Sequence, residues 1–363
     1  MLPAHVRVAS MLFIGVAVIA CSDSSAPSAT QPTPISKALA SATVRVLPGL
    51  DGLIPTAIND ADEVVGYTKA ALPFRWTPAH GLVMLSHGKF VGALPSSVSD
   101  RGVIAGTAIR STESVVASNG ALWDSAGSFR VLADPSDSVG LDGQNICVAS
   151  GINVWGHIIG TCEIPHGFYN GIDNFDWHGP ATSAGGVLQA NSQFMSVSDD
   201  NWIGGDINSQ GIPTAPIIVS PTGQIIQLRG HDGLVHDFSV VLAVTRKGYA
   251  AGYSTEGGCQ EAVAWLSHPG QSFPEIRMGT CGESTGITPD QVISGTGSDA
   301  NQDASSFFAF VASRASGFAH LPGLGKTGET STAVGINASH HILGTITSSG
   351  VTHVVIWNLA SGL

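Results

Sequence analysis

The sequence predicts an all-β protein: a seven-bladed β-propeller with four-stranded antiparallel blades, its ring closed by the N-terminal strand. Three observations predict this fold. Short β-branched runs alternate with turn residues, one motif recurs seven times, and an N-terminal segment resembles the strand that the last repeat lacks. The 363 residues include 45 glycines and only 12% charged residues, and no long segment has a 3.6-residue period. The chain is therefore rich in strands and turns.

Residues 1–20 read as an export signal, because a basic start precedes an apolar run from Met11 to Ala20 that is too short to span a bilayer. The sequence at 18–21, Val-Ile-Ala-Cys, resembles a bacterial lipobox, which implies that Cys21 carries a lipid. The alternative is an ordinary signal peptide followed by an unpaired cysteine. The residue after the cysteine is Ser22, and by the same resemblance this implies that the protein is anchored in the outer membrane. It would lie on either the periplasmic or the cell-surface side.

Residues 21–42 consist mainly of Ser, Ala, Thr and Pro, with only Asp23 and Lys37 charged. Such a composition cannot bury a core and predicts a disordered tether. The propeller then occupies residues 43–363. Removal of the signal makes the formal charge of −12 one unit more negative, because Arg7 is lost with no acid. This excess of acids argues against nucleic acid as a partner.

The repeat begins with an apolar residue, followed by Asn, Ser or Thr at the second position and by two variable residues. Its fifth position is rich in glycine. One further residue and two mostly apolar residues then precede a closing glycine. Its copies span 58–66, 98–106, 152–160, 197–205, 244–252, 287–295 and 336–344. Closing glycines are 40 to 54 residues apart, which suits four short strands with their connections.

Each copy predicts a tight hairpin in which the fifth residue adopts a left-handed conformation. That position holds Asp62, Gly102, Gly156, Asn201, Gly248, Gln291 and His340, of which Gln291 and His340 are the strained exceptions. The closing glycine lies inside the second strand, where glycine marks a bulge or a close backbone approach.

An aromatic-centred third strand follows each closing glycine, and we expect its central residue to pack in the core. These residues are Trp76, Trp123, Trp177, Ile218, Trp265, Phe310 and Trp357. A fourth strand follows in six repeats, around Leu85, Leu132, Leu188, Leu228, Ile276 and Leu321. The seventh repeat has too few residues left for one, but residues 44–50 closely resemble residues 318–324. We therefore expect residues 44–47 to pair beside Trp357 and close the ring.

The repeat core, clearest at 58–66 and 152–160, resembles the HAF family of probable extracellular repeat proteins. The resemblance covers most of residues 43–363, although the His-Ala-Phe tripeptide of the family is not intact. It implies an exported β-repeat protein and carries over no active site.

Two motifs resemble catalytic or phosphate-binding sequences. Residues 282–286 match the G-x-S-x-G pattern around Ser284, but a strand rather than a helix follows, which favours a connecting loop between repeats. Residues 323–327 resemble the end of a phosphate-binding loop without its first glycine, which favours an exit turn.

The four cysteines after Cys21 form two symmetric pairs about hairpin turns, Cys147 with Cys162 and Cys259 with Cys281. Each pair would face its partner across adjacent strands, so we predict two disulfides; buried free thiols are the alternative. Neither pair has zinc spacing, and we expect no metal and no cofactor.

Histidines and acids gather in the longest predicted loops, which lie at the end of the propeller opposite the tight hairpins. These candidate ligand-binding residues are His166, Tyr169, Asp173, Asp176, His231, Asp232, His236 and Asp237. Solvated loop residues are the alternative. Trp155 and Trp202, in or beside tight hairpins, are rival candidates at the opposite end.

The function favoured by the sequence is an envelope-anchored binding or scaffold protein that recognises a glycan, peptide or protein with one propeller face. A lyase or hydrolase with a site at one end of the ring is the alternative, because propellers host both classes. We expect a monomer that contacts the membrane only through its lipid.

Overall fold

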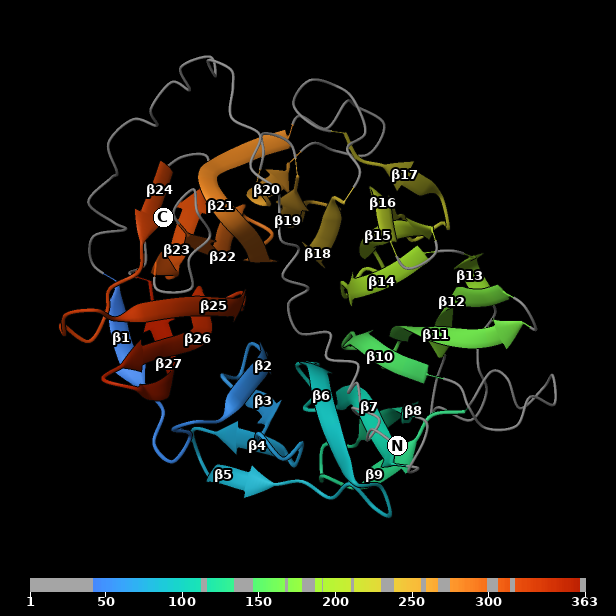
Figure 1. The fold of residues 1–363 in the computed structure, drawn as a ribbon, viewed down its shortest axis with the longest axis horizontal. Helices are drawn as coiled ribbons and strands as arrows, with labels where there is room; N and C mark the ends of the chain where they lie inside the picture. The colour runs from blue at the N-terminus through green and yellow to red at the C-terminus, as the bar shows by residue number, and fades with distance from the viewer. Residues whose placement is uncertain are drawn as a thin grey trace, which may run out of the picture.

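The computed structural model describes most of the chain from residue 42 onward: 42–111, 116–133, 146–166, 169–177, 187–190, 192–209, 212–229, 238–255, 259–266, 275–298, 306–313 and 317–359. Within these ranges every regular element is a β-strand. The sheets are arranged around a common centre, as in a propeller (Figure 1). The predicted all-β class and propeller arrangement are confirmed.

Three sheets of the described residues contain four strands each. The first comprises β2 (Ile54–Ile58), β3 (Val64–Tyr67), β4 (Pro73–Thr77) and β5 (Gly81–Met84). The second comprises β14 (Ser192–Val197), β15 (Ile203–Ser209), β16 (Ile212–Val219) and β17 (Ile225–Gln227). The third joins the two ends of the described chain through β25 (Thr330–Ile336), β26 (His341–Ser348), β27 (Val351–Asn358) and β1 (Thr43–Val46).

The other two described sheets have eight and seven strands. The eight are β6 (Gly92–Val98), β7 (Ile104–Ser111), β8 (Val116–Trp123), β9 (Phe129–Val131), β10 (Ile146–Ile152), β11 (Ile158–His166), β12 (Tyr169–Trp177) and β13 (Val187–Ala190). The seven are β18 (Val240–Val244), β19 (Ala250–Ser254), β20 (Glu261–Trp265), β21 (Glu275–Ile287), β22 (Val292–Ser298), β23 (Phe308–Ser313) and β24 (Gly317–His320).

The described hydrogen bonds thus form five sheets where seven four-stranded ones were predicted. Two junctions account for the difference. A parallel bridge between Ile146 and Ser118 joins β10 to β8. The 13-residue β21 runs without a break from the fourth strand of one repeat into the first strand of the next.

The N-terminal strand pairs where the permuted repeat predicted. β1 lies antiparallel to β27 with Val44 opposite Trp357. The pairing continues through Leu47, whose N–H donates to the carbonyl of Val354 at 2.9 Å and whose side chain is fully buried. The predicted pairing of residues 44–47 is confirmed.

A bulge in the first strand lies opposite the closing glycine of all seven repeats. At Gly66 and Gly344, a Cβ would collide with a first-strand carbonyl oxygen, that of Ile54 and Thr332 respectively. The predicted bulge and close approach are both present, and they exclude any side chain at this position.

Hydroxyl groups at the bulges tie three repeats to the next. Ser96 and Ser150 donate from Oγ to the carbonyls of Ala149 and Phe194. Thr285 Oγ1 donates to the carbonyl of Ala333 at 3.1 Å. The bulge therefore shapes its own sheet and also joins neighbouring first strands.

The fifth position of the repeat has a positive φ in all seven copies, between 58° and 81°. The prediction holds even for Gln291 and His340, the two residues least suited to this conformation. His340 also contacts Asp290 of the preceding repeat, with Nε2 2.9 Å from Oδ2.

The third-strand aromatic residues are core residues wherever their side chains are described. Trp123, Trp265 and Trp357 are fully buried. Each indole N–H donates to a carbonyl just beyond the fourth strand of the preceding repeat: Trp123 to Ser86, Trp265 to Arg229 and Trp357 to Pro322. These bonds satisfy the buried indole and fix the distance between repeats.

At the tips of the tight hairpins, asparagine and aspartate connect three pairs of repeats. The side-chain amides of Asn59, Asn153 and Asn337 donate to the second-position carbonyl of the following repeat. In the same three pairs, an aspartate at the third position of the following repeat accepts the N–H of the preceding hairpin; these acceptors are Asp100, Asp199 and Asp60. One of the three pairs joins the last repeat to the first.

We predict that Asn337→Ser lowers the free energy of unfolding by about 1 to 2 kcal/mol. Serine, which other repeats carry here, can still accept its own hairpin's N–H, as Ser99 does, but it cannot reach the carbonyl of Asn59. Denaturant titration measures the change. Ser339→Ala, an exposed change in the same hairpin, is the control. Equal stabilities of the two variants would contradict the prediction.

Candidate functional site

The tight hairpins of all seven repeats converge on one pocket of about 260 Å³ at the centre of the molecule. All of its lining residues occupy the first three positions of a repeat, as do Ile58, Asn59 and Asp60 of the first. The bulges and left-handed turns described above therefore position the pocket wall. This end is called the hairpin face below.

Acidic side chains dominate one side of this pocket. Asp60, Asp100 and Asp199 line it from three different repeats, and Arg246 lines it from a fourth. Burial raises the pKa of Asp100, and the charges of Asp60 and Asp199 raise it further. These carboxylates therefore lie close enough to repel one another, so the pocket mouth is unfavourable for an anion.

Trp155 stands beside this mouth and is 67% exposed, the most exposed large apolar side chain among the described residues. Its indole Nε1–H donates to the carbonyl of Asp199 at 3.0 Å. The guanidinium of Arg101 lies 5.3 Å from the ring centroid. The ring is thus held at fixed orientation by two neighbouring repeats, although it buries little surface.

Trp202, the other rival candidate, has a different environment. It packs against the core formed by β16 to β20, and its ring lies over Gly248. Trp155 is therefore exposed, whereas Trp202 is half-buried.

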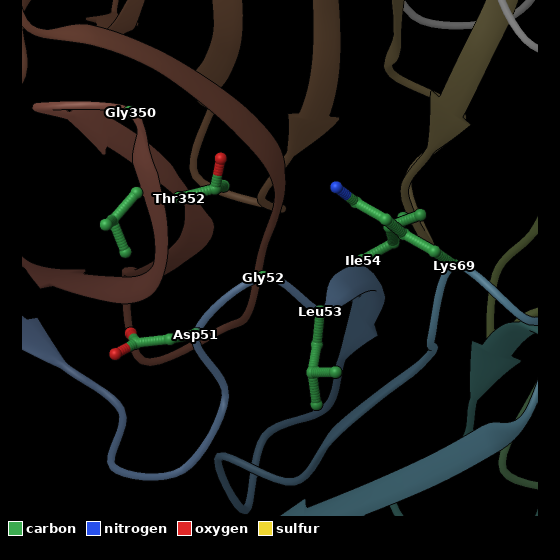
Figure 2. Close-up of a pocket in the computed structure, with 8 residues that line it drawn as sticks. Asp51, Gly52, Leu53, Ile54, Lys69, Gly350 and Thr352 are labelled. Carbon is green, nitrogen blue, oxygen red and sulfur yellow. The ribbon is translucent and has the colours of Figure 1, made fainter.

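The opposite end of the molecule carries a second pocket, of about 330 Å³ (Figure 2). It lies between the connection from β1 to β2, the β3–β4 loop and the β26–β27 hairpin. Inter-repeat connections and second-to-third-strand turns therefore share one end, opposite the tight hairpins. Lys69 supplies its cation and Asp51 its carboxylate.

The residues predicted from long loops fall into two groups. His166, Tyr169, Asp173 and Asp176 lie in the β11–β12 pair, with His166 opposite Tyr169, Cys162 opposite Asp173 and Ile159 opposite Asp176. His231, Asp232, His236 and Asp237 lie outside the described residues. The four residues of the first group were expected in a long loop, but they lie in strands, because the β11–β12 ladder continues from Ile158 and Trp177 to His166 and Tyr169.

Both predicted disulfides are present, Cys147–Cys162 across β10 and β11 and Cys259–Cys281 between β21 and the residues just before β20. Cys147 is directly opposite Cys162 in the ladder. Two disulfides are typical of a protein outside the reducing cytoplasm.

Ser284 does not lie in a connecting loop, contrary to expectation. It is a fully buried residue within β21, opposite Gly295, because this strand continues across the junction between two repeats. A buried strand position lacks the exposed turn that a nucleophile elbow requires. Residues 323–327 contain no helix, in keeping with the predicted exit turn.

Sequence reasoning missed a buried acid. Asp206 on β15 follows the closing glycine of its repeat, is fully buried, and neither of its carboxyl oxygens has a hydrogen-bond partner. Burial raises its pKa to about 7. Burial also raises the pKa of Glu283, and burial together with the charges of Asp206 and Glu283 raises the pKa of Tyr253 to about 12. The three residues occupy corresponding levels of consecutive repeats.

A carboxyl group with a pKa near neutrality could act as a general acid or base. Asp206, however, exposes no surface and lines neither of the two pockets described above. The described residues also contain no group of three or more His, Cys, Asp or Glu side chains suited to a metal ion. None of the described segments is a helix long and apolar enough to span a bilayer.

No family model and no curated protein matches the chain. Among solved structures it is similar to an oligogalacturonate lyase in complex with manganese, with 11% identity and a TM-score of 0.50 over 91% of this chain and 96% of that one. It is also similar to TolB from Acinetobacter baumannii (11% identity, TM-score 0.39, covering 86% and 79%) and to the WD40 propeller domain of Doa1 (12%, 0.40, 88% and 98%). The first of these similarities supports the propeller fold and carries no information on function.

The raised pKa of Asp206 predicts how stability depends on pH. Between about pH 4 and pH 7 the unfolded carboxyl ionises while the folded one keeps its proton, so the free energy of unfolding falls through this window and stays low above it. Asp206→Asn cannot titrate. Its stability relative to the native protein should therefore rise across this window by roughly 2 to 4 kcal/mol.

Urea denaturation at half-unit pH intervals measures this difference. Asp200→Asn, an exposed change in the same repeat region, serves as the control and should produce little change at any pH in the window. A stability difference for Asp206→Asn that stays constant from pH 4 to pH 8 would show that Asp206 does not titrate near neutrality.

Proposed function

We propose that the protein is an exported binding or scaffold protein that recognises its ligand, a glycan, peptide or protein, through the hairpin face. The observation that carries this proposal is Trp155. An exposed tryptophan fixed by a hydrogen bond and a stacked arginine adds little to the core, yet it offers a rigid apolar surface. Such preorganised aromatic residues lose little entropy on binding.

The negative charge at the pocket mouth limits the kinds of ligand that can bind there. Asp60, Asp100 and Asp199 disfavour an acidic ligand, so we propose a neutral glycan or a neutral to basic peptide segment that contacts Trp155. The sector of β11 and β12, where His166 and Tyr169 lie, remains the alternative binding face.

We further propose that the ring consists of seven blades and is closed by β1. Three observations support this count: seven sequence repeats, a central pocket lined by all seven, and hydrogen bonds from Asn337 and Ala338 of the last repeat to the first. Each of the two large sheets then comprises two blades, joined at β8–β10 and within β21. An experimental structure with six or eight blades would contradict the proposed number of seven.

The enzyme alternative rests on Asp206 and Glu283, whose raised pKa values suit proton transfer. Asp206 is fully buried, Glu283 is half-buried, and neither lines a described pocket, which favours binding as the function because a catalytic carboxyl must reach its substrate.

Trp155→Ala should weaken binding by at least about tenfold, because truncation removes the contact surface of a central aromatic residue. The probes are arrays of neutral and acidic oligosaccharides and of short peptides, followed by titration of the best binder. Thermal unfolding should be nearly unchanged, since Trp155 is largely exposed.

The controls are Trp202→Phe on the same face and Tyr169→Ala in the alternative sector. Loss of binding only with Tyr169→Ala would assign the ligand to the β11–β12 sector. Equal affinity of native protein and Trp155→Ala for every binder would reject the hairpin face.

We also propose that the chain is anchored to the outer membrane through a lipid on Cys21, with residues 21–42 as a tether and HAF-type repeats as the folded part. Cys21→Ser should move the protein from the membrane fraction to the soluble fraction, because one residue carries the lipid. Cell fractionation and mass spectrometry of the N-terminal peptide provide the measurement. Membrane retention without lipid mass would reject the anchor.

A further inference from the structure

The pocket at the opposite end from Trp155 is built from rigid turns. Thr68 fixes the β3–β4 loop that carries Lys69, since its Oγ1 accepts the N–H groups of Ala70 and Leu72 at 3.2 Å each. The β26–β27 hairpin turns through Ser349 and Gly350, both with positive φ. A two-residue turn of this kind holds its shape without a ligand.

The connection from β1 to β2 forms the third wall and is hydrogen-bonded to the hairpin strand. The N–H of Gly52 donates to the carbonyl of Thr352 at 2.7 Å, and Leu53 donates to Leu50 at 3.1 Å. All three walls are therefore preorganised.

Lys69 is the one cation lining this pocket, and the described residues offer it no ion-pair partner. The nearby acid, Asp51, is already engaged, with Oδ1 2.8 Å from Nδ1 of His353. In Figure 2 the carboxyl group of Asp51 points away from Lys69, whereas the ammonium group extends over the pocket. A single unpaired cation thus faces the pocket interior.

Apolar side chains supply the rest of the lining. Leu53 and Ile54 are half-buried, and Val351 is 44% exposed. A volume of about 330 Å³ lies at the lower end of those found for small-molecule sites. The pocket therefore combines an unpaired ammonium group, a carboxylate that already contacts His353, and a short apolar wall.

We propose that this pocket binds an organic carboxylate with a short apolar body, its carboxylate pairing with Lys69 and its apolar part packing on Leu53 and Val351. A free short-chain acid and the C-terminus of a peptide share this chemistry. The site is independent of the hairpin face and of any ligand bound there.

The test uses the purified full-length protein and three probes in isothermal titration: isobutyrate, N-acetyl-alanyl-valine, and the amide of that dipeptide. The acids should bind with dissociation constants of about 1 mM, and the amide at least about tenfold more weakly. An ionic strength of about 0.5 M should weaken binding of the acids. Tighter binding of the dipeptide acid than of isobutyrate would identify a peptide terminus as the source, and equal binding a free acid.

Lys69→Gln should reduce affinity for the acids by about tenfold or more, while Lys69→Arg retains it, because only the second keeps the charge. Lys326→Gln, a matched change of an exposed lysine in another repeat, should have no effect. All three variants should unfold at the native temperature. Equal binding of acid and amide, no binding of either acid, or unchanged affinity in Lys69→Gln would each overturn the proposal.

Discussion

The close approach of the first two strands at six of the closing glycines is the constraint on which the other features depend. Glycine is required because a carbonyl of the first strand fills the space of a side chain. The bulge opposite it bends the first strand, aims the hairpin toward the central pocket, and in three repeats exposes a hydroxyl that bonds the next repeat. The hairpin face and the central pocket thus depend on one backbone contact.

Side-chain hydrogen bonds link some repeats to the next and not others. Where the second residue is asparagine, as in the first, third and seventh copies, the following copy carries aspartate at its third position, and both bonds form. Copies with serine or threonine lack this match. The seventh and first copies, which are not consecutive in the sequence, are therefore linked by both of these hydrogen bonds.

Much of this arrangement could be predicted from the sequence because it depends on short local patterns of residue types. The left-handed fifth position, the bulge, the buried third-strand aromatics, both disulfides and the β1–β27 pairing all follow from residue types at fixed spacing. The continuous strand β21 could not be predicted, because Gly282 and Gly286 favour a turn. The strand is extended only by its pairing with the strands on either side. Asp206 was missed for a similar reason: a polar residue after the closing glycine predicts exposure, and its burial arises from neighbouring repeats.

The pairing of β1 with β27 has a consequence for folding kinetics. The strand β1 precedes all other described strands and pairs with β27, the most C-terminal of them, so their ladder cannot form until β27 has been synthesised. Contacts of such long sequence separation form slowly, and until then β1 and the edge of β27 remain open to pairing with other chains.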